Sequence, residues 1–204
     1  MRLSSAAIAL FAAFALGSAP VAAAGLSGIG AAIFGNTFSF KQPNVDKVPV
    51  KAISVGKLQV ALQRTKLQDV QKAFGGTIQS QGDGSTRATW LCYNADNANV
   101  WFISNALGGF EFVMMVAAEQ ASKPSAGCEA PSAGFVAPNF GIPSLGASTS
   151  DLKAAFGNAN GSKVSYRFDR PGGYSNIAQY LGYVLKGGKV SAIGVGETSV
   201  PTQH

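Results

Sequence analysis

The feature that most constrains the fold of this chain is a short pattern that occurs twice. The heptapeptide DVQKAFG at residues 69–75 and the heptapeptide DLKAAFG at residues 151–157 match in kind, at an offset of 82 residues. Each has an apolar pair four residues apart, such as Val70 with Phe74, which a helix would place on one face. Each also ends on a Gly, where a helix C-terminus is expected. The pattern therefore predicts two short amphipathic helices, the second with an N-cap at Ser148.

Strand-like runs separated by strong turn signals follow each predicted helix. A double glycine, Gly108-Gly109 in the first copy and Gly187-Gly188 in the second, recurs as a hairpin signal. The expected strands of the first copy are residues 77–81, 86–93, 100–106 and 110–119. Those of the second copy are residues 163–169, 177–186 and 189–196. Each copy therefore predicts an antiparallel meander of about four strands.

We predict an α+β protein with two tandem repeats, each a short helical layer followed by an antiparallel β-meander. Residues 55–62 and 140–146 are expected to add a short helix or turn before each helix. The predicted organisation is a signal peptide (1–24), a Gly/Ala/Pro-rich leader (25–54), a first repeat (55–120), a linker (121–138), a second repeat (139–200) and a tail (201–204).

A helical layer followed by an antiparallel meander, present twice in a chain with a secretion signal, resembles the fold of the beta-lactamase inhibitory protein family. The same unit, in single copy, occurs in small outer-membrane lipoproteins of the barrel-assembly machinery. The resemblance covers about residues 55–200 and is carried by the D-[LV]-x-x-A-F-G helix motif and the strands after it. It implies a fold and a role in protein binding, and it transfers no contact residue to this chain.

The first 24 residues are typical of a secretory signal peptide. Arg2 precedes an apolar run of about eleven residues, which is too short for the roughly 20 residues that span a bilayer, and small residues end the segment at Ala24. Residues 1–24 contain Arg2 and no acid, so the rest of the chain has 15 basic against 10 acidic residues. We therefore expect a periplasmic or secreted, bacterial protein with no membrane span after cleavage.

Two cysteines outside the cytosol usually form one disulfide. We predict the pair Cys92–Cys128, which would tie the linker to the second strand of the first repeat. In the chain-entropy description, closing this loop stabilises the fold by on the order of 3 to 4 kcal/mol. A zinc site is not expected, because the chain has one His and two Cys in all.

The composition excludes several classes of function. The basic residues are scattered and form no dense run of the kind that binds nucleic acid. The only His is His204, at the C-terminus, so Ser-His-acid and Cys-His sites lack their base. The cluster Asn94, Asp96, Asn97 and Asn99 lacks the spacing of a calcium loop and is typical of a turn. We expect no enzyme activity, cofactor or metal.

The predicted binding residues come from strand parity. Side chains alternate between the two faces of a sheet, and the helices are expected to cover only one face. The covered face would take Ala88, Trp90 and Cys92 in the first repeat. The other face is unusually aromatic and carries the five candidate binding residues Arg87, Tyr93, Trp101, Arg167 and Tyr180. Alternatively, the leader or the other repeat packs over this face and these residues belong to a core.

We predict a non-enzymatic module that binds a protein partner in the cell envelope or outside the cell, through the open sheet faces of its two repeats. The alternative is a binder of a small apolar or cell-wall-derived ligand in the groove between the repeats. A broad, shallow aromatic surface would favour the protein partner, and a pocket of several hundred Å³ the small ligand.

Overall fold

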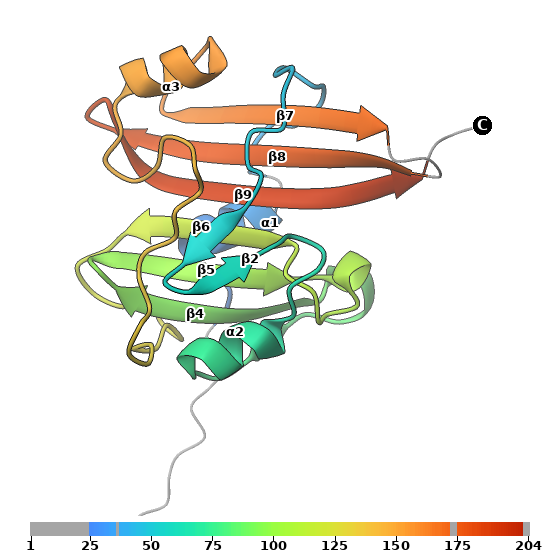
Figure 1. Cartoon of the computed structure of the whole chain (residues 1–204), viewed down its shortest axis with the longest axis vertical. Coiled ribbons are helices and arrows are strands. Elements are labelled where there is room, and N and C mark those ends of the chain that lie inside the picture. The colour runs from blue at the N-terminus through green and yellow to red at the C-terminus, as the bar shows by residue number, and fades with distance from the viewer. Residues whose placement is uncertain (1–24, 36, 172–174, 202–204) are drawn as a thin grey trace, which may run out of the picture.

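The computed structural model describes residues 25–35, 37–171 and 175–201, and a long antiparallel β-sheet dominates it (Figure 1). Two predicted segments lie outside the described residues: the signal peptide at residues 1–24 and residues 202–204 of the tail. From one edge to the other, the strands are β3 (Gln79–Gln81), β4 (Ala88–Ala95), β5 (Ala98–Ser104), β6 (Met115–Gln120), β9 (Lys189–Pro201), β8 (Ser175–Lys186) and β7 (Lys163–Pro171). The α+β class predicted from the sequence is confirmed.

Both predicted helices are present, as α2 (Leu67–Phe74) and α3 (Thr149–Phe156). In each, the carboxylate of the third residue, Asp69 or Asp151, accepts the backbone N–H of the cap residue, at 3.0 and 2.7 Å. The backbone N–H of Ser148, together with the Ser148 hydroxyl, lowers the pKa of Asp151. Both helices lie on the same face of the sheet (Figure 1). Their buried apolar residues are Leu67, Val70, Phe74 and Leu152.

Pairing of β6 with β9 joins the two halves of the chain into one sheet. The register runs from Met115 opposite Gly196 to Glu119 opposite Ala192. Each half consists of a helix followed by a meander, α2 before β3 to β6 and α3 before β7 to β9. The second meander has three strands, and residues 140–146 before α3 form bends and a turn. The hairpin turn expected at Gly108-Gly109 is wrong, because Asn105 caps a short 3-10 helix (Ala106–Gly108) there and β6 begins only at Met115. That the two halves are repeats of one unit stays a prediction.

The segment before α2 is a β-hairpin, so the helix or turn expected over residues 55–62 was the wrong assignment. β1 (Ile53–Val55) pairs antiparallel with β2 (Leu58–Val60), and Gly56 in the turn has a φ of +55°. A Gly at this point favours a two-residue turn over the interior of a helix. The hairpin residues that enter the core are Ile53, Val55 and Val60.

The leader packs against the sheet, which was the alternative to an open face. Its helix α1 (Gly28–Phe34) lies over β6 and β9, on the face opposite to α2 and α3 (Figure 1). Ile29 and Ile33 of α1 are buried against that face, and Phe38 beyond the helix is buried there too. The sheet therefore has a core on each side.

Three small residues make room for the leader. Ala117, Gly194 and Gly182 lie side by side across β6, β9 and β8, and we call them the small-residue strip. A Cβ built on Gly194 would lie 3.0 Å from Cγ1 of Ile33, and one built on Gly182 would lie 2.7 Å from the Phe38 ring. Gly inside a strand commonly marks such a close approach. The leader can reach the sheet backbone because these positions carry little or no side chain.

Beyond the small-residue strip, the leader passes around the free edge of β7. The backbone N–H groups of Asn44 and Val45 both donate to the carbonyl of Arg167, at 2.9 and 3.3 Å. The Asn44 side chain donates to the carbonyl of Ser165 at 3.0 Å and accepts the N–H of Arg167 at 2.8 Å. Val50 then lies on the helix face of the sheet, so the leader contacts both faces and covers part of an edge.

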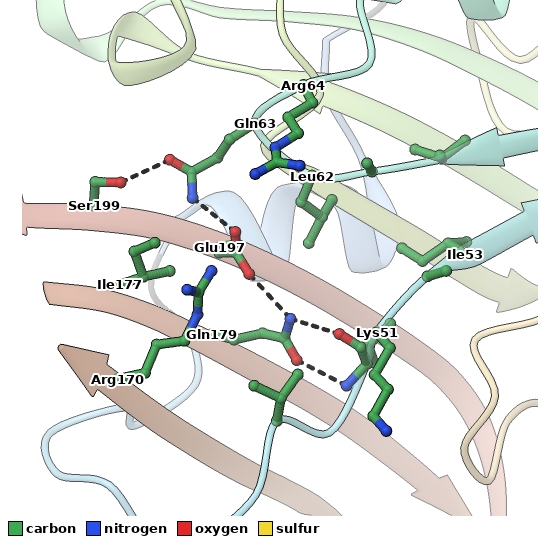
Figure 2. A pocket seen from close by; sticks show the side chains of 15 residues that line it. Lys51, Ile53, Leu62, Gln63, Arg64, Arg170, Ile177, Gln179, Glu197 and Ser199 are labelled. Atoms are coloured by element: carbon green, nitrogen blue, oxygen red, sulfur yellow. Dashed lines mark hydrogen bonds between the residues drawn. The ribbon is translucent and has the colours of Figure 1, made fainter. Parts of the chain in front are cut away.

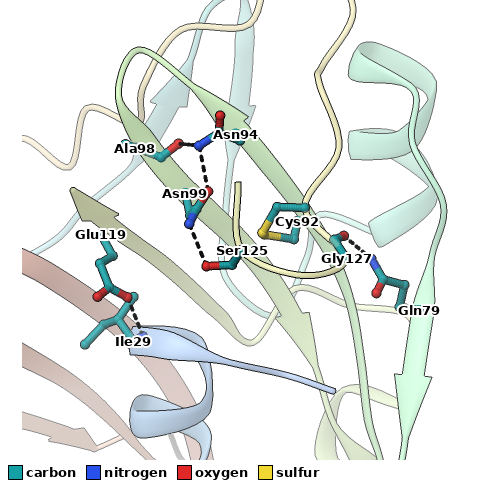
Figure 3. Close-up of a disulfide and its surroundings, with 10 residues drawn as sticks. Ile29, Gln79, Cys92, Asn94, Ala98, Asn99, Glu119, Ser125 and Gly127 are labelled. Carbon is teal, nitrogen blue, oxygen red and sulfur yellow. Dashed lines mark hydrogen bonds between the residues drawn. A yellow bond between two sulfur atoms is a disulfide. The ribbon is translucent and has the colours of Figure 1, made fainter. Parts of the chain in front are cut away.

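The disulfide Cys92–Cys128 is present as predicted and joins the linker to β4 (Figure 3). Beside it, Glu129 donates its N–H to the carbonyl of Cys92 at 3.0 Å, which extends the edge of β4. The buried Asn99 amide donates to the hydroxyl of Ser125 at 2.7 Å. Disulfides form in oxidising compartments, so the bond indicates that the protein matures outside the cytosol.

We predict that Gly194→Val displaces α1, because its side chain would collide with Ile33. Amide hydrogen exchange of residues 28–34 should become faster, and the buried Trp101 should become accessible to a fluorescence quencher. Thr198→Val in the same strand, away from the small-residue strip, is the control and should leave both readouts unchanged. Unchanged exchange in Gly194→Val would show that the leader does not depend on this contact.

Candidate functional site

Two of the five predicted binding residues are buried on opposite faces of the sheet. Trp101 is 1% exposed beneath α1, where a Cβ built on Gly30 would lie 3.0 Å from its ring. Tyr93 is buried on the α2 face; its hydroxyl donates to the carbonyl of Gly75 at 2.7 Å, and its ring meets Phe74 edge-on. A single platform that exposes Trp101 and Tyr93 together does not exist in this fold.

The strand register explains this correction. The two-residue turn Asp96-Asn97, with φ values of +53° and +58°, pairs β4 with β5 so that Cys92 lies opposite Trp101. Directly opposed residues share a face, so Cys92 lies with Trp101 on the α1 face, and Tyr93 points the other way. The sequence-based parity of β4 was therefore wrong by one residue. Three residues of β4 that were expected on the helix face therefore lie on the α1 face: Ala88, Trp90 and Cys92.

Tyr180 and Arg167 lie opposite each other on β8 and β7, and the leader covers both. The ring of Phe40 lies 5.0 Å from that of Tyr180, centroid to centroid. Arg167 donates through Nη1 to the carbonyl of Phe40 at 2.7 Å. It also makes two hydrogen bonds to the carboxylate of Asp169, at 2.7 and 2.8 Å. These contacts hold the leader against the sheet.

A hollow of about 490 Å³ remains at the rim of the covered face, and it contains two of the five predicted residues. Leu107, which is 69% exposed, stands beside it. Arg87 is exposed nearby and stacks over Phe110 at 4.9 Å. The apolar, aromatic and cationic residues that line the hollow include Ile33, Phe34, Phe40, Met115, Arg167 and Tyr180.

Four tyrosines of the described residues have raised pKa values, and burial is the main cause in each. Burial raises the pKa of Tyr166 and of Tyr180 to about 12. It also raises the pKa of Tyr93, with a smaller contribution from Glu129, and of Tyr183, with a smaller contribution from Tyr166. All four phenols are protonated at neutral pH. Three donate to backbone carbonyls and so join loops to the sheet: Tyr93, Tyr166 and Tyr183.

A second hollow, of about 550 Å³, opens on the helix face where the two halves of the chain meet (Figure 2). We call it the groove. Its walls are the leader before β1, the residues after β2, and the adjoining ends of β7, β8 and β9. The lining residues are Val48, Val50, Lys51, Ala52, Ile53, Val60, Ala61, Leu62, Gln63, Arg64, Arg170, Ile177, Gln179, Glu197 and Ser199.

A hydrogen-bond network holds the polar side of the groove (Figure 2). The carboxylate of Glu197 accepts from Gln63 Nε2 at 2.9 Å and from Gln179 Nε2 at 3.2 Å. The buried Gln179 side chain also accepts the N–H of Val50 at 2.8 Å and donates through Nε2 to the carbonyl of Val50 at 2.9 Å. Ser199 donates to Gln63 Oε1 at 2.9 Å. One carboxylate thus connects the first half, the second half and the leader.

Gln63 reaches this network from a left-handed backbone conformation. Its φ is +63°, which is uncommon for a residue with a side chain, and its N–H donates to the carbonyl of Val113 at 2.8 Å. Such conformations cost on the order of 1 to 3 kcal/mol and cluster at functional sites. The sequence carries no Gly or Asn at this position to signal the turn. The sequence-based alternative expected a ligand groove between the two halves, but it named neither Gln63 nor the other residues that line the groove.

The groove carries more positive than negative charge. Lys51, Arg64 and Arg170 line it and are exposed, and the only carboxylate among its lining residues is Glu197. Within residues 25–35, 37–171 and 175–201, neither arginine forms an ion pair. In the same ranges, no three His, Cys, Asp or Glu side chains come together as a metal site.

No family model, curated protein or solved structure that was compared matches this chain. Among the described helices, none combines the length and the apolar character that a bilayer crossing requires.

We predict that Trp101→Ala lowers the free energy of unfolding by about 3 to 5 kcal/mol, as expected for removal of a buried aromatic side chain. Urea denaturation followed by circular dichroism measures this change. Arg87→Gln is the control, because its stacking on Phe110 contributes about 1 kcal/mol at most. Equal, small effects of both variants would contradict the burial of Trp101.

Proposed function

We propose that this protein is a non-enzymatic, periplasmic or secreted binding protein that takes a small organic ligand in the groove. The observation that carries the proposal is the groove itself, about 550 Å³, with an apolar side and a fixed polar side. Ligand sites are typically concavities of this size, lined by apolar residues with a few placed polar groups. The predicted signal peptide and the Cys92–Cys128 disulfide support a place outside the cytosol.

The polar network supports a binding role over simple packing. Glu197 is only half-buried, yet two amides hold its carboxylate in one position. Gln63 meets the carboxylate from a left-handed backbone conformation, of a kind that clusters at functional sites. A surface carboxylate gains little stability from such an arrangement, whereas a ligand gains from side chains that are already oriented.

The resemblance to the beta-lactamase inhibitory protein family suggests a second candidate, the binding of a protein partner. The observation that favours it is Leu107, a large exposed apolar residue beside the aromatic hollow at Phe40 and Tyr180. Exposed apolar residues next to aromatic and Arg side chains are typical of interface hot spots. This surface replaces the platform expected on the open sheet faces.

Binding of phenylnaphthylamine, a neutral apolar fluorophore, tests the ligand groove. Ile177→Trp fills the groove and should weaken this binding by about tenfold, the effect of losing roughly 1.4 kcal/mol of contact. Asn176→Trp is the matched control, since the adjacent residue of β8 points to the other face. Undiminished binding by a folded Ile177→Trp protein, or no binding by the natural protein, would rule out the groove as the site.

The second candidate predicts that Leu107→Ser abolishes capture of a partner from an envelope extract. Val136, the other large exposed apolar residue of the described chain, provides the control variant Val136→Ser. Quantitative mass spectrometry of the captured proteins should show one protein lost with the first variant and retained with the second. Equal capture by both variants would leave Leu107 without a role in binding.

A further inference from the structure

The charges of the groove indicate what kind of ligand fits it, on the basis that the groove is a ligand site as proposed above. Three cationic side chains, Lys51, Arg64 and Arg170, and one carboxylate, Glu197, give the lining a formal charge of +2. Gln63 and Gln179 each donate to one oxygen of that carboxylate, and within the described residues neither Arg64 nor Arg170 forms an ion pair with it or with another acid. The arginines therefore have no acidic partner in the groove.

The two arginines come from distant parts of the chain and reach the groove from opposite sides. Arg64 follows the turn at Gln63, and Arg170 lies near the end of β7, opposite Ile177 of β8. Figure 2 shows both guanidinium groups extending toward the middle of the groove, with the Glu197 network between them. Arg167, three residues before Arg170, differs from both arginines of the groove, because its guanidinium pairs with both carboxylate oxygens of Asp169.

An apolar surface lies next to the arginines. Ile53 is buried, whereas Leu62 and Ile177 are half-buried and line the space that the guanidinium groups border. A ligand that fits this surface has an apolar body and one end that can meet a guanidinium. Planar guanidinium groups match carboxylate and phosphate oxygens, because paired N–H donors face paired acceptors.

We propose that the groove binds an organic oxyanion, whose carboxylate or phosphate is held by Arg64 and Arg170 and whose apolar body rests on Leu62 and Ile177. Lys51, at the rim, adds attraction without a fixed geometry.

A matched pair of fluorophores tests this inference. Anilinonaphthalene sulfonate has the apolar body of phenylnaphthylamine and adds one oxyanion, so the two differ in the group at issue. The sulfonate should bind the natural protein about tenfold more tightly than the neutral compound, as expected for charge-assisted hydrogen bonds. Arg64→Gln and Arg170→Gln should each remove most of this preference, because the affinity for the sulfonate falls much more than the affinity for the neutral compound. Arg87→Gln, which changes the net charge equally outside the groove, should retain it.

Displacement of the bound sulfonate identifies the oxyanion. Benzoate and phenyl phosphate carry a carboxylate and a phosphate on the same ring, and displacement by either supports the proposal, whereas displacement by neither overturns it. Equal affinity for the two fluorophores, or an equal loss in Arg87→Gln, would also overturn it. If, in those cases, Ile177→Trp still weakens binding of the neutral fluorophore, the groove remains a ligand site and only the oxyanion is ruled out. The proposed function fails by a different result: the neutral fluorophore then does not bind, or Ile177→Trp binds it as well as the natural protein does.

Discussion

The close contact between the leader and the small-residue strip is the interaction on which the rest of the architecture depends. Ile33 and Phe38 lie over Gly194 and Gly182, where a Cβ would come within 3.0 Å or less of them. A sheet with a helix layer on only one side would leave Trp101 and the neighbouring apolar residues in water. With the leader in place, the same residues form a second core. The leader is therefore part of the folded domain, because it supplies the missing layer.

The path of the leader connects this second core to the groove. After Phe38 the chain passes around the edge of β7 at Asn44 and reaches the helix face at Val50. There Gln179 joins both backbone groups of Val50, and the same amide donates to Glu197. One wall of the groove is thus formed by the same leader that docks on the opposite face. The binding of a ligand as proposed for the groove would therefore also stabilise the docked leader, because both depend on this contact.

Much of the fold could be predicted from the sequence, because the signals were local. The heptapeptide pattern predicted α2 and α3, and the double glycine at Gly187 predicted the turn between β8 and β9. Compartment reasoning predicted the Cys92–Cys128 bond from two cysteines alone. The face assignment of β4 failed for a local reason as well. The turn Asp96-Asn97 was recognised, but the register that a two-residue turn imposes was not applied to Tyr93.

The residues of the groove could not be predicted, since they come from five separate segments. Gln63, Arg170, Gln179 and Glu197 share no spacing or motif, and they meet only because β9 pairs with β6 as well as β8. By itself the sequence determined helices α2 and α3, most strands, the turn between β8 and β9 and the disulfide, which follow from periodicity, backbone preference and redox chemistry. Only the tertiary structure decided which face the leader covers and which charges face one another. Those outcomes depend on contacts between residues more than 100 positions apart, such as Gln63 with Glu197, and no local pattern encodes them.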